Sequence, residues 1–300
     1  MAARVGALTE NIALLALCAT TFEPVTEDFL PLEIPAIGGH TLTLQHEQQI
    51  TEAFAILLAH TDDPSAVGAI CVEEQRNLVG LLVRTAVNSG SQRERMTNFK
   101  RIARALEECA MERNEEAFFE EIIAACQPRL LGRLRSCHGR SFRKAAKPAI
   151  ISRLYEAMHI LNQLRIRPYG FASVQDQIAS LENEYMRLEA LPRTDAHSGP
   201  GRQCLKVILC VIEKILASTD IRALLNRIPK ETPAWSGPAA DSLARRLMCL
   251  AQYQYAARYL LRRARKDSKF RRLSIAEIPS GLFPASPHGS EPHSVGYRLA

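Results

Sequence analysis

The sequence lacks the short motifs by which many enzyme families are recognised. It has no GxxxxGK[ST] loop, whose glycines would let backbone N–H groups surround a phosphate, and no GxGxxG. The GxSxG nucleophile elbow and the signatures of kinases and deaminases are also absent. These absences exclude the enzyme classes that the motifs define and leave only classes without a short signature.

Closely spaced metal ligands are lacking too. Neither CxxC nor HExxH occurs, and the nearest pairs are Cys137 beside His138 and Cys204 with Cys210. The eight cysteines are scattered through apolar helical runs, unlike the regular framework of a small secreted domain. We therefore expect no metal, no cofactor, and mostly buried, reduced cysteines.

Long hydrophobic runs are missing as well. The apolar run from Asn11 to Ala19 follows Glu10 and is too short to span a bilayer, so it favours a first helix packed on the protein over a signal peptide. No other stretch approaches the roughly eighteen apolar residues of a membrane span. We expect a cytoplasmic or nuclear protein without a membrane span.

Helical periodicity is what the chain has in abundance. With 300 residues, 47% of them hydrophobic, it is large enough to bury one large or two modest cores. Apolar residues recur every three or four positions except at about residues 67–87, where two apolar runs flank a polar turn. The prediction is a mostly α protein, an irregular helical bundle with one short β-hairpin near the N-terminal third.

Turn-forming residues suggest how this bundle is divided. Residues 193–201 are the best candidate linker, between a helical region at 1–192 that contains the hairpin and a second at 202–267 packed on the first. Proline, serine and histidine accumulate from 268 to 300, which predicts a disordered tail. A helix is also expected to end at Pro128.

One helix carries the clearest apolar seam. Its spacing of three and four residues is that of a helix packed against another helix, and favours an intramolecular pair over a homodimer through the same seam. The seam residues are Phe171, Val174, Ile178, Leu181, Tyr185 and Leu188.

Charge is distributed unevenly along the chain. The first 75 residues hold one basic residue, Arg4, against eleven acidic ones, and the basic residues of the later part gather in two clusters. The first basic cluster consists of Arg129, Arg133, Arg135, Arg140, Arg143, Lys144 and Lys147. The second basic cluster consists of Arg258, Arg262, Arg263, Arg265, Lys266, Lys269, Arg271 and Arg272.

These clusters allow several interpretations. For the first cluster, one interpretation is phosphate binding and the other is ion pairing with the acidic N-terminal part of the chain. For the second cluster, the interpretations are complementing a helix dipole, acting as a nuclear import signal, and binding nucleic acid. Tyr253, Tyr255 and Tyr259 lie among its first arginines and suit stacking on single-stranded bases or packing on each other. Ser274 follows Arg271-Arg272-Leu273 as a candidate phosphorylation site, where added negative charge would weaken anion binding.

One segment supports a resemblance. Asp62 to Val87, with Asp-Asp-Pro and the runs Ala-Ile-Cys-Val-Glu-Glu and Gly-Leu-Leu-Val-Arg-Thr-Ala-Val-Asn, resembles a segment of uncharacterised filamentous-fungal proteins. The resemblance implies a fungal accessory or regulatory role and no catalytic residues.

Three functions follow as hypotheses. The first is a non-enzymatic interaction or regulatory protein with a protein partner. The second is an enzyme or small-molecule-binding protein with a site between helices, involving His159 or Tyr155. The third is a nucleic-acid binder that uses the two basic clusters.

Overall fold

The computed structural model describes residues 42–59, 68–74, 80–87, 92–139, 148–166, 171–229 and 237–278. The prediction of a mostly α protein with a few strands is confirmed, whereas the first helix expected near Asn11 lies outside the described residues. The helices are α2 (Leu44–Leu58), α3 (Gln92–Glu112), α4 (Glu115–Leu134), α5 (Ile150–Gln163), α6 (Phe171–Glu189), α7 (Arg193–Ala196), α8 (Gly199–Ser218), α9 (Ile221–Leu225) and α10 (Gly237–Lys266). The strands are β1 (Gly68–Glu74), β2 (Leu81–Val87) and β3 (Leu273–Glu277).

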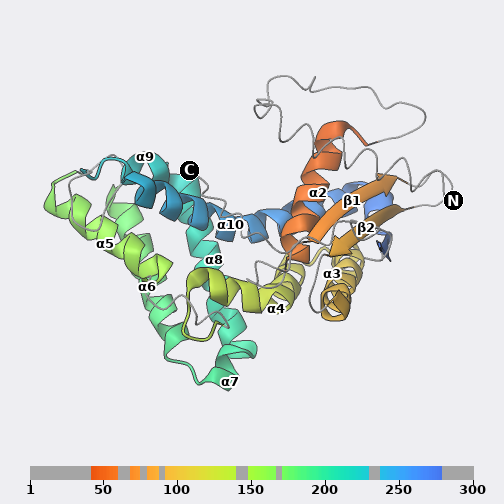
Figure 1. The fold of residues 1–300 in the computed structure, drawn as a ribbon, viewed down its shortest axis with the longest axis horizontal. Coiled ribbons are helices and arrows are strands. Elements are labelled where there is room, and N and C mark those ends of the chain that lie inside the picture. The colour runs from red at the N-terminus through yellow and green to blue at the C-terminus, as the bar shows by residue number, and fades with distance from the viewer. Residues whose placement is uncertain are drawn as a thin grey trace, which may run out of the picture.

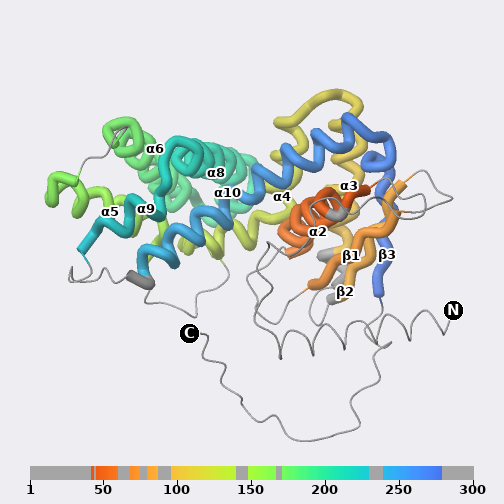
Figure 2. Tube along the Cα trace, turned by 90° about the horizontal axis from the view of Figure 1, so that it is seen from above, coloured from red at the N-terminus to blue at the C-terminus, as the bar shows by residue number. Residues whose placement is uncertain are grey.

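These elements form two lobes joined by two helices (Figures 1 and 2). The sheet lobe contains α2, α3 and the three strands, and the helical lobe contains α5 to α9. Helices α4 and α10 run from one lobe into the other, and one continuous apolar core follows them. Among the described helices, none combines the length and the apolar character that a membrane crossing needs.

The predicted hairpin is present, but it belongs to a three-stranded sheet. β1 and β2 are antiparallel, with Val72 opposite Val83, and β2 also pairs with β3 in parallel, with Val83 opposite Ile275. Val72 and Val83 are buried, as expected for the face covered by α2 and α3. The edges of the sheet are therefore β1 and β3.

The third strand comes from residues that the sequence assigned to a disordered tail. Residues 268–278 instead form a short 3-10 helix (Ser268–Phe270) and β3, while residues 279–300 lie outside the described part. Phe270 is 4% exposed, and the Leu81 N–H donates to the Arg272 carbonyl at 3.0 Å. The prediction of a disordered tail was therefore wrong for residues 268–278. Burial of Phe270 and the backbone hydrogen bonds between β2 and β3 order this segment although its average composition is polar.

Helix α4 also differs from the prediction, because it continues through Pro128 to Leu134. A proline inside a helix removes one backbone hydrogen bond. Beyond it, however, Leu130, Leu131 and Leu134 are fully buried and continue the apolar face. The helix ends where Arg135 adopts a left-handed conformation, with φ of 57°.

The apolar seam of α6 packs inside the chain. Its six side chains are 0–5% exposed, and α6 packs on α8 and α5. The intramolecular interpretation therefore fits, and we do not propose a homodimer through the same buried side chains.

The predicted linker at residues 193–201 contains α7 and the first turn of α8. A Cβ on Gly201 would collide with the backbone of Ala196, so this glycine permits the close approach of α8 to α7. The Gln127 side chain on α4 donates to the Ala196 carbonyl at 2.8 Å. The glycine that suggested a linker serves packing instead.

Leu181→Ala tests this packing. Leu181 is fully buried, so the substitution should lower the free energy of unfolding by about 2–5 kcal/mol through reduced burial and the cavity left behind. Met186 lies on the same helix but is 59% exposed, and Met186→Ala should change stability by less than about 0.5 kcal/mol. Urea denaturation measures both, and equal losses of stability would contradict the buried seam.

Candidate functional site

The second basic cluster is partly neutralised by acidic side chains from distant elements. Arg258 pairs with Glu115 on α4 at 3.1 Å and also with Glu213 on α8. The Lys269 ammonium lies 2.6 Å from Glu74 on β1, whose side chain is only 6% exposed. These two cations already have carboxylate partners within the chain.

Other members of the second basic cluster have structural roles at the end of α10. Arg271 Nε donates to the Ala264 carbonyl at 2.9 Å, which satisfies a backbone acceptor in the last turn of the helix. This contact matches the interpretation in which basic residues complement a helix C-terminus. Arg265 is half-buried, and Arg272 is exposed on the turn into β3, next to the exposed Ser274.

The remaining members lie along one face of α10. Arg262 and Lys266 are exposed and make no ion pair with another described residue, and Arg263 is half-buried. Tyr255 and Tyr259 share this face, because residues four and seven positions apart lie on the same side of a helix. Tyr253 does not, since it is fully buried beneath the Arg133 guanidinium.

The first basic cluster lies where α4 ends and α5 begins. Arg133 Nη1 donates to the Cys249 carbonyl of α10 at 3.0 Å, and Arg135 Nη1 donates to the Pro148 carbonyl at 2.9 Å. Arg129 lies on α4, whereas Arg140, Arg143, Lys144 and Lys147 lie outside the described residues. Arg133 and Arg135 are thus anchored at the junction of α4, α5 and α10.

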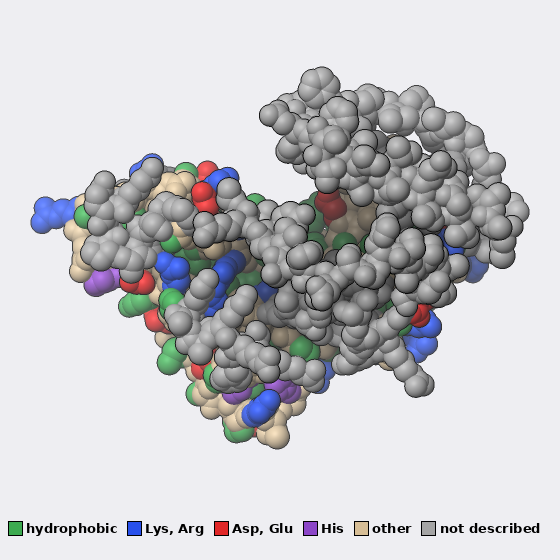
Figure 3. All heavy atoms as spheres, viewed as in Figure 1, with side chains coloured by type: hydrophobic (Ala, Val, Ile, Leu, Met, Phe, Trp, Pro, Cys, Tyr) green, Lys and Arg blue, Asp and Glu red, His purple; other side chains and the backbone are tan. Residues whose placement is uncertain are grey.

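At this junction Arg135 is accompanied by Arg153 of α5 and Arg246 of α10. All three are half-buried, and we call them the arginine hollow. Loss of water, followed by the positive charges of Arg246 and Arg153, lowers the pKa of the Arg135 guanidinium. Figure 3 shows Lys and Arg side chains gathered in a hollow between α5 and α10. Sequence inspection missed this group because Arg246 is far from the others in the chain.

Local backbone adds to the positive potential of the arginine hollow. Ala149 occupies the N-cap of α5 and has no side-chain oxygen to accept the first N–H groups, and the first turn contains no acid. The helix dipole makes such an end electropositive. From Ile122 to Tyr155 the chain carries eight Lys or Arg residues and no Asp or Glu. The Glu189 carboxylate of α6, which accepts from the Cys137 N–H at 2.8 Å, brings negative charge to the end of α4 from another segment.

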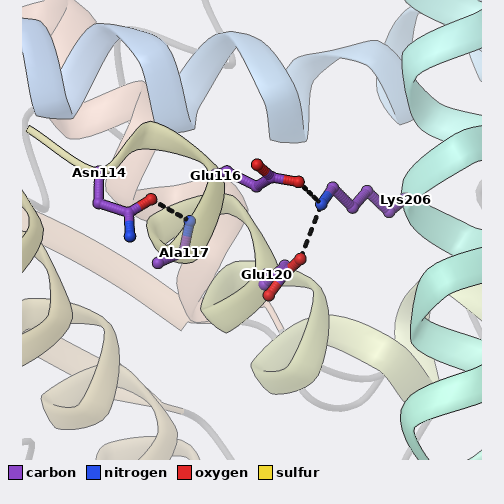
Figure 4. A network of polar contacts seen from close by, with 5 residues as sticks. All are labelled: Asn114, Glu116, Ala117, Glu120 and Lys206. Atoms are coloured by element: carbon purple, nitrogen blue, oxygen red, sulfur yellow. Dashed lines mark hydrogen bonds and ion pairs between the residues drawn. The ribbon is translucent and has the colours of Figure 1, made fainter.

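At the start of α4 the charges are arranged differently, because a basic side chain there is paired with acidic ones. There the Lys206 ammonium of α8 meets Glu120 at 2.7 Å and also contacts Glu116 (Figure 4). Hydrogen bonds to these carboxylates raise the pKa of the lysine. Asn114 caps the helix by accepting from the Ala117 N–H at 3.0 Å. These glutamates form a structural ion-pair network between α4 and α8.

The residues proposed for catalysis do not converge. His159 Nε2 contacts Gln163 Nε2 of its own helix, at 3.0 Å, and both His159 and Tyr155 are exposed. Within the part of the chain that the structure describes, no three His, Cys, Asp or Glu side chains are grouped as metal ligands.

A shallow groove of about 300 Å³ lies between α3 and β3. Its lining is Lys100, Ala103, Arg104, Glu107, Leu273 and Ile275.

Cys137 and His138, adjacent in sequence, point to different partners. The Cys137 N–H donates to Glu189 Oε2 at 2.8 Å, and buried His138 contacts the Leu188 carbonyl through Nε2 at 3.1 Å. Loss of water around the sulfur, together with the Glu189 carboxylate, raises the pKa of the Cys137 thiol to about 11. A thiol in this setting is a poor nucleophile at neutral pH.

Alkylation of Cys137 tests this electrostatic setting. At pH 8 its thiolate fraction should be at least about a hundredfold lower than that of a free cysteine, so iodoacetamide should label it slowly although the residue is exposed. Glu189→Gln should accelerate labelling by removing the negative charge. Peptide mass spectrometry measures the rate across pH, and fast labelling at pH 7 would refute the assignment.

Comparison with known proteins adds no assignment. No family model, no curated protein and no solved structure matches this chain. The resemblance of residues 62–87 to filamentous-fungal proteins therefore stays a prediction.

Proposed function

We propose that this chain is a non-enzymatic binding protein that holds nucleic acid by its phosphates at the arginine hollow. The observation that carries the proposal is that the positive charges of Arg153 and Arg246 act on Arg135 at the junction of α4, α5 and α10, while the chain segment around Arg135 and Arg153 contains no acid. Like charges repel, and an anion bound among the guanidiniums would reduce that repulsion. Arginine also forms paired hydrogen bonds with phosphate oxygens.

Three cations outside the hollow are paired within the chain. Arg258, Lys206 and Lys269 each have carboxylate partners, so their charges are already balanced within the chain. A nucleic acid offers a row of phosphates, and a basic surface gains affinity by displacing their counterions. The arginine hollow matches such a row in sign, and the sequence carries four further cations between Gly139 and Pro148.

Nuclear import through the second basic cluster is less favoured. An import signal is read from an accessible basic segment, but Arg258, Lys269 and Arg271 of this cluster are engaged with other parts of the chain. Interaction with a protein partner remains compatible with the proposal, since a nucleic-acid-binding protein is itself an interaction protein.

The salt dependence of binding tests the proposed function. The intact chain is compared with the double variant R153Q/R246Q. The affinity of each for a labelled duplex DNA is measured by fluorescence anisotropy at several salt concentrations. The intact chain should bind with an affinity that falls as salt rises. The double variant should bind more weakly, with a slope of log affinity against log salt reduced by about 0.7–0.9 for each phosphate that the protein no longer neutralises.

Two controls make this test specific. R153K/R246K retains the charge and should retain most of the salt slope, whereas R193Q removes an exposed arginine on α7, away from the hollow (Figure 1). Thermal unfolding of each variant confirms that it is folded. A folded R153Q/R246Q variant with the affinity of the intact chain, or an intact chain that fails to bind at low salt, would overturn the proposal.

A further inference from the structure

Two tyrosines and an arginine form a stack on α10. The rings of Tyr255 and Tyr259 are nearly parallel, at 15°, with centroids 6.1 Å apart. The Arg263 guanidinium lies over the Tyr259 ring, 5.7 Å from its centroid. Planar groups separated in this way attract one another through dispersion and through the charge distribution of the rings. The order of the stack is therefore guanidinium, ring, ring.

The two ends of this stack differ. Tyr259 is half-buried, and its hydroxyl donates to the His46 carbonyl of α2 at 3.5 Å, which places it against the sheet lobe. Tyr255 is 56% exposed. An aromatic side chain that lies nearly parallel to its neighbour and is open to solvent is a preorganised surface on which a further planar group can stack.

We propose that Tyr255 is a stacking platform for an unpaired base of single-stranded nucleic acid. This inference rests on the proposed function, and it adds the kind of nucleic acid that is bound. Every base has a flat face, so stacking on tyrosine favours single strands without demanding a particular sequence. A duplex keeps its bases stacked on one another and offers this platform only its ends.

The charges beside Tyr255 suit the backbone of such a strand. Arg262 follows Tyr255 by seven residues and Lys266 by eleven, so both lie on the same face of α10, and both are exposed. At 1.5 Å per residue, Arg262 lies about 10 Å along the helix from Tyr255, a distance that one or two nucleotides span. Glu115 and Glu213, which approach this part of α10, are paired with Arg258. The platform thus lies beside two exposed cations that make no ion pair with a described acid.

The same face of α10 continues toward the helical lobe. Met248 precedes Tyr255 by seven residues and is 55% exposed, and Arg245 is exposed one turn earlier. The sequence showed the tyrosines among arginines, but it could not separate Tyr253, which is buried, from Tyr255, which is open. That difference depends on which side of α10 faces the core.

The experiment compares two oligonucleotides of equal charge. A labelled oligothymidylate of about ten nucleotides and an abasic oligonucleotide of the same length are bound to the full chain and to variants at low salt. The intact chain should prefer the oligothymidylate. Tyr255→Leu should weaken that binding by about 5- to 150-fold, because one base loses its stacking partner, and should leave abasic binding unchanged. Tyr255→Phe keeps the ring and should behave like the intact chain.

Matched variants separate this inference from the proposed function. Tyr155→Leu removes another exposed tyrosine, on α5, and should not change the preference for bases. R153Q/R246Q should weaken binding of both oligonucleotides by a similar factor, since both carry the same phosphates. Equal binding of the two oligonucleotides by the intact chain, or an unchanged preference in Tyr255→Leu, would overturn the platform while leaving phosphate binding standing. Failure of both oligonucleotides to bind would overturn both proposals.

Discussion

Helix α10 packs on both lobes, and the rest of the structure depends on that packing. Its buried side contacts α2 and α3 in the sheet lobe and α8 and α9 in the helical lobe, with Tyr253, Leu260 and Leu261 at 0–1% exposure. Buried apolar area is the main favourable contribution to folding, so a helix shared by two lobes couples their stabilities. The chain then follows α10 directly into β3, which completes the sheet.

The same helix determines which cations remain available. Where α10 faces α4 and α8, Arg258 meets carboxylates, and just beyond its end Lys269 meets Glu74. On the face that also carries the half-buried Tyr259, Arg262 and Lys266 are exposed, as is Tyr255. Arg246 extends from α10 toward the junction with α5. Helix packing therefore divides the second basic cluster between structural ion pairs and the exposed cations near Tyr255, whereas the arginine hollow is formed by Arg246 with Arg135 and Arg153 from other helices.

The sequence predicted well those elements that depend on residues close together in the chain. The α6 seam and the hairpin depend on apolar residues a few positions apart, and both are present. β3 was missed because its pairing partner, β2, is distant in sequence and its flanking composition is polar. Pro128 was taken as a helix end, although buried apolar residues on both sides of it keep α4 continuous. The arginine hollow was missed for a similar reason, because Arg246 is distant in sequence from Arg135 and Arg153 and only tertiary packing brings it near them.

Hydrogen exchange under increasing denaturant tests most directly whether α10 unites the two lobes. If it does, peptides from β2 and α3 and peptides from α6 and α8 should lose protection together, in one unfolding event. Peptides from the middle of α10 should show the same free energy of opening as both lobes. Loss of protection in one lobe at low denaturant, while the other lobe and its half of α10 stay protected, would contradict the account.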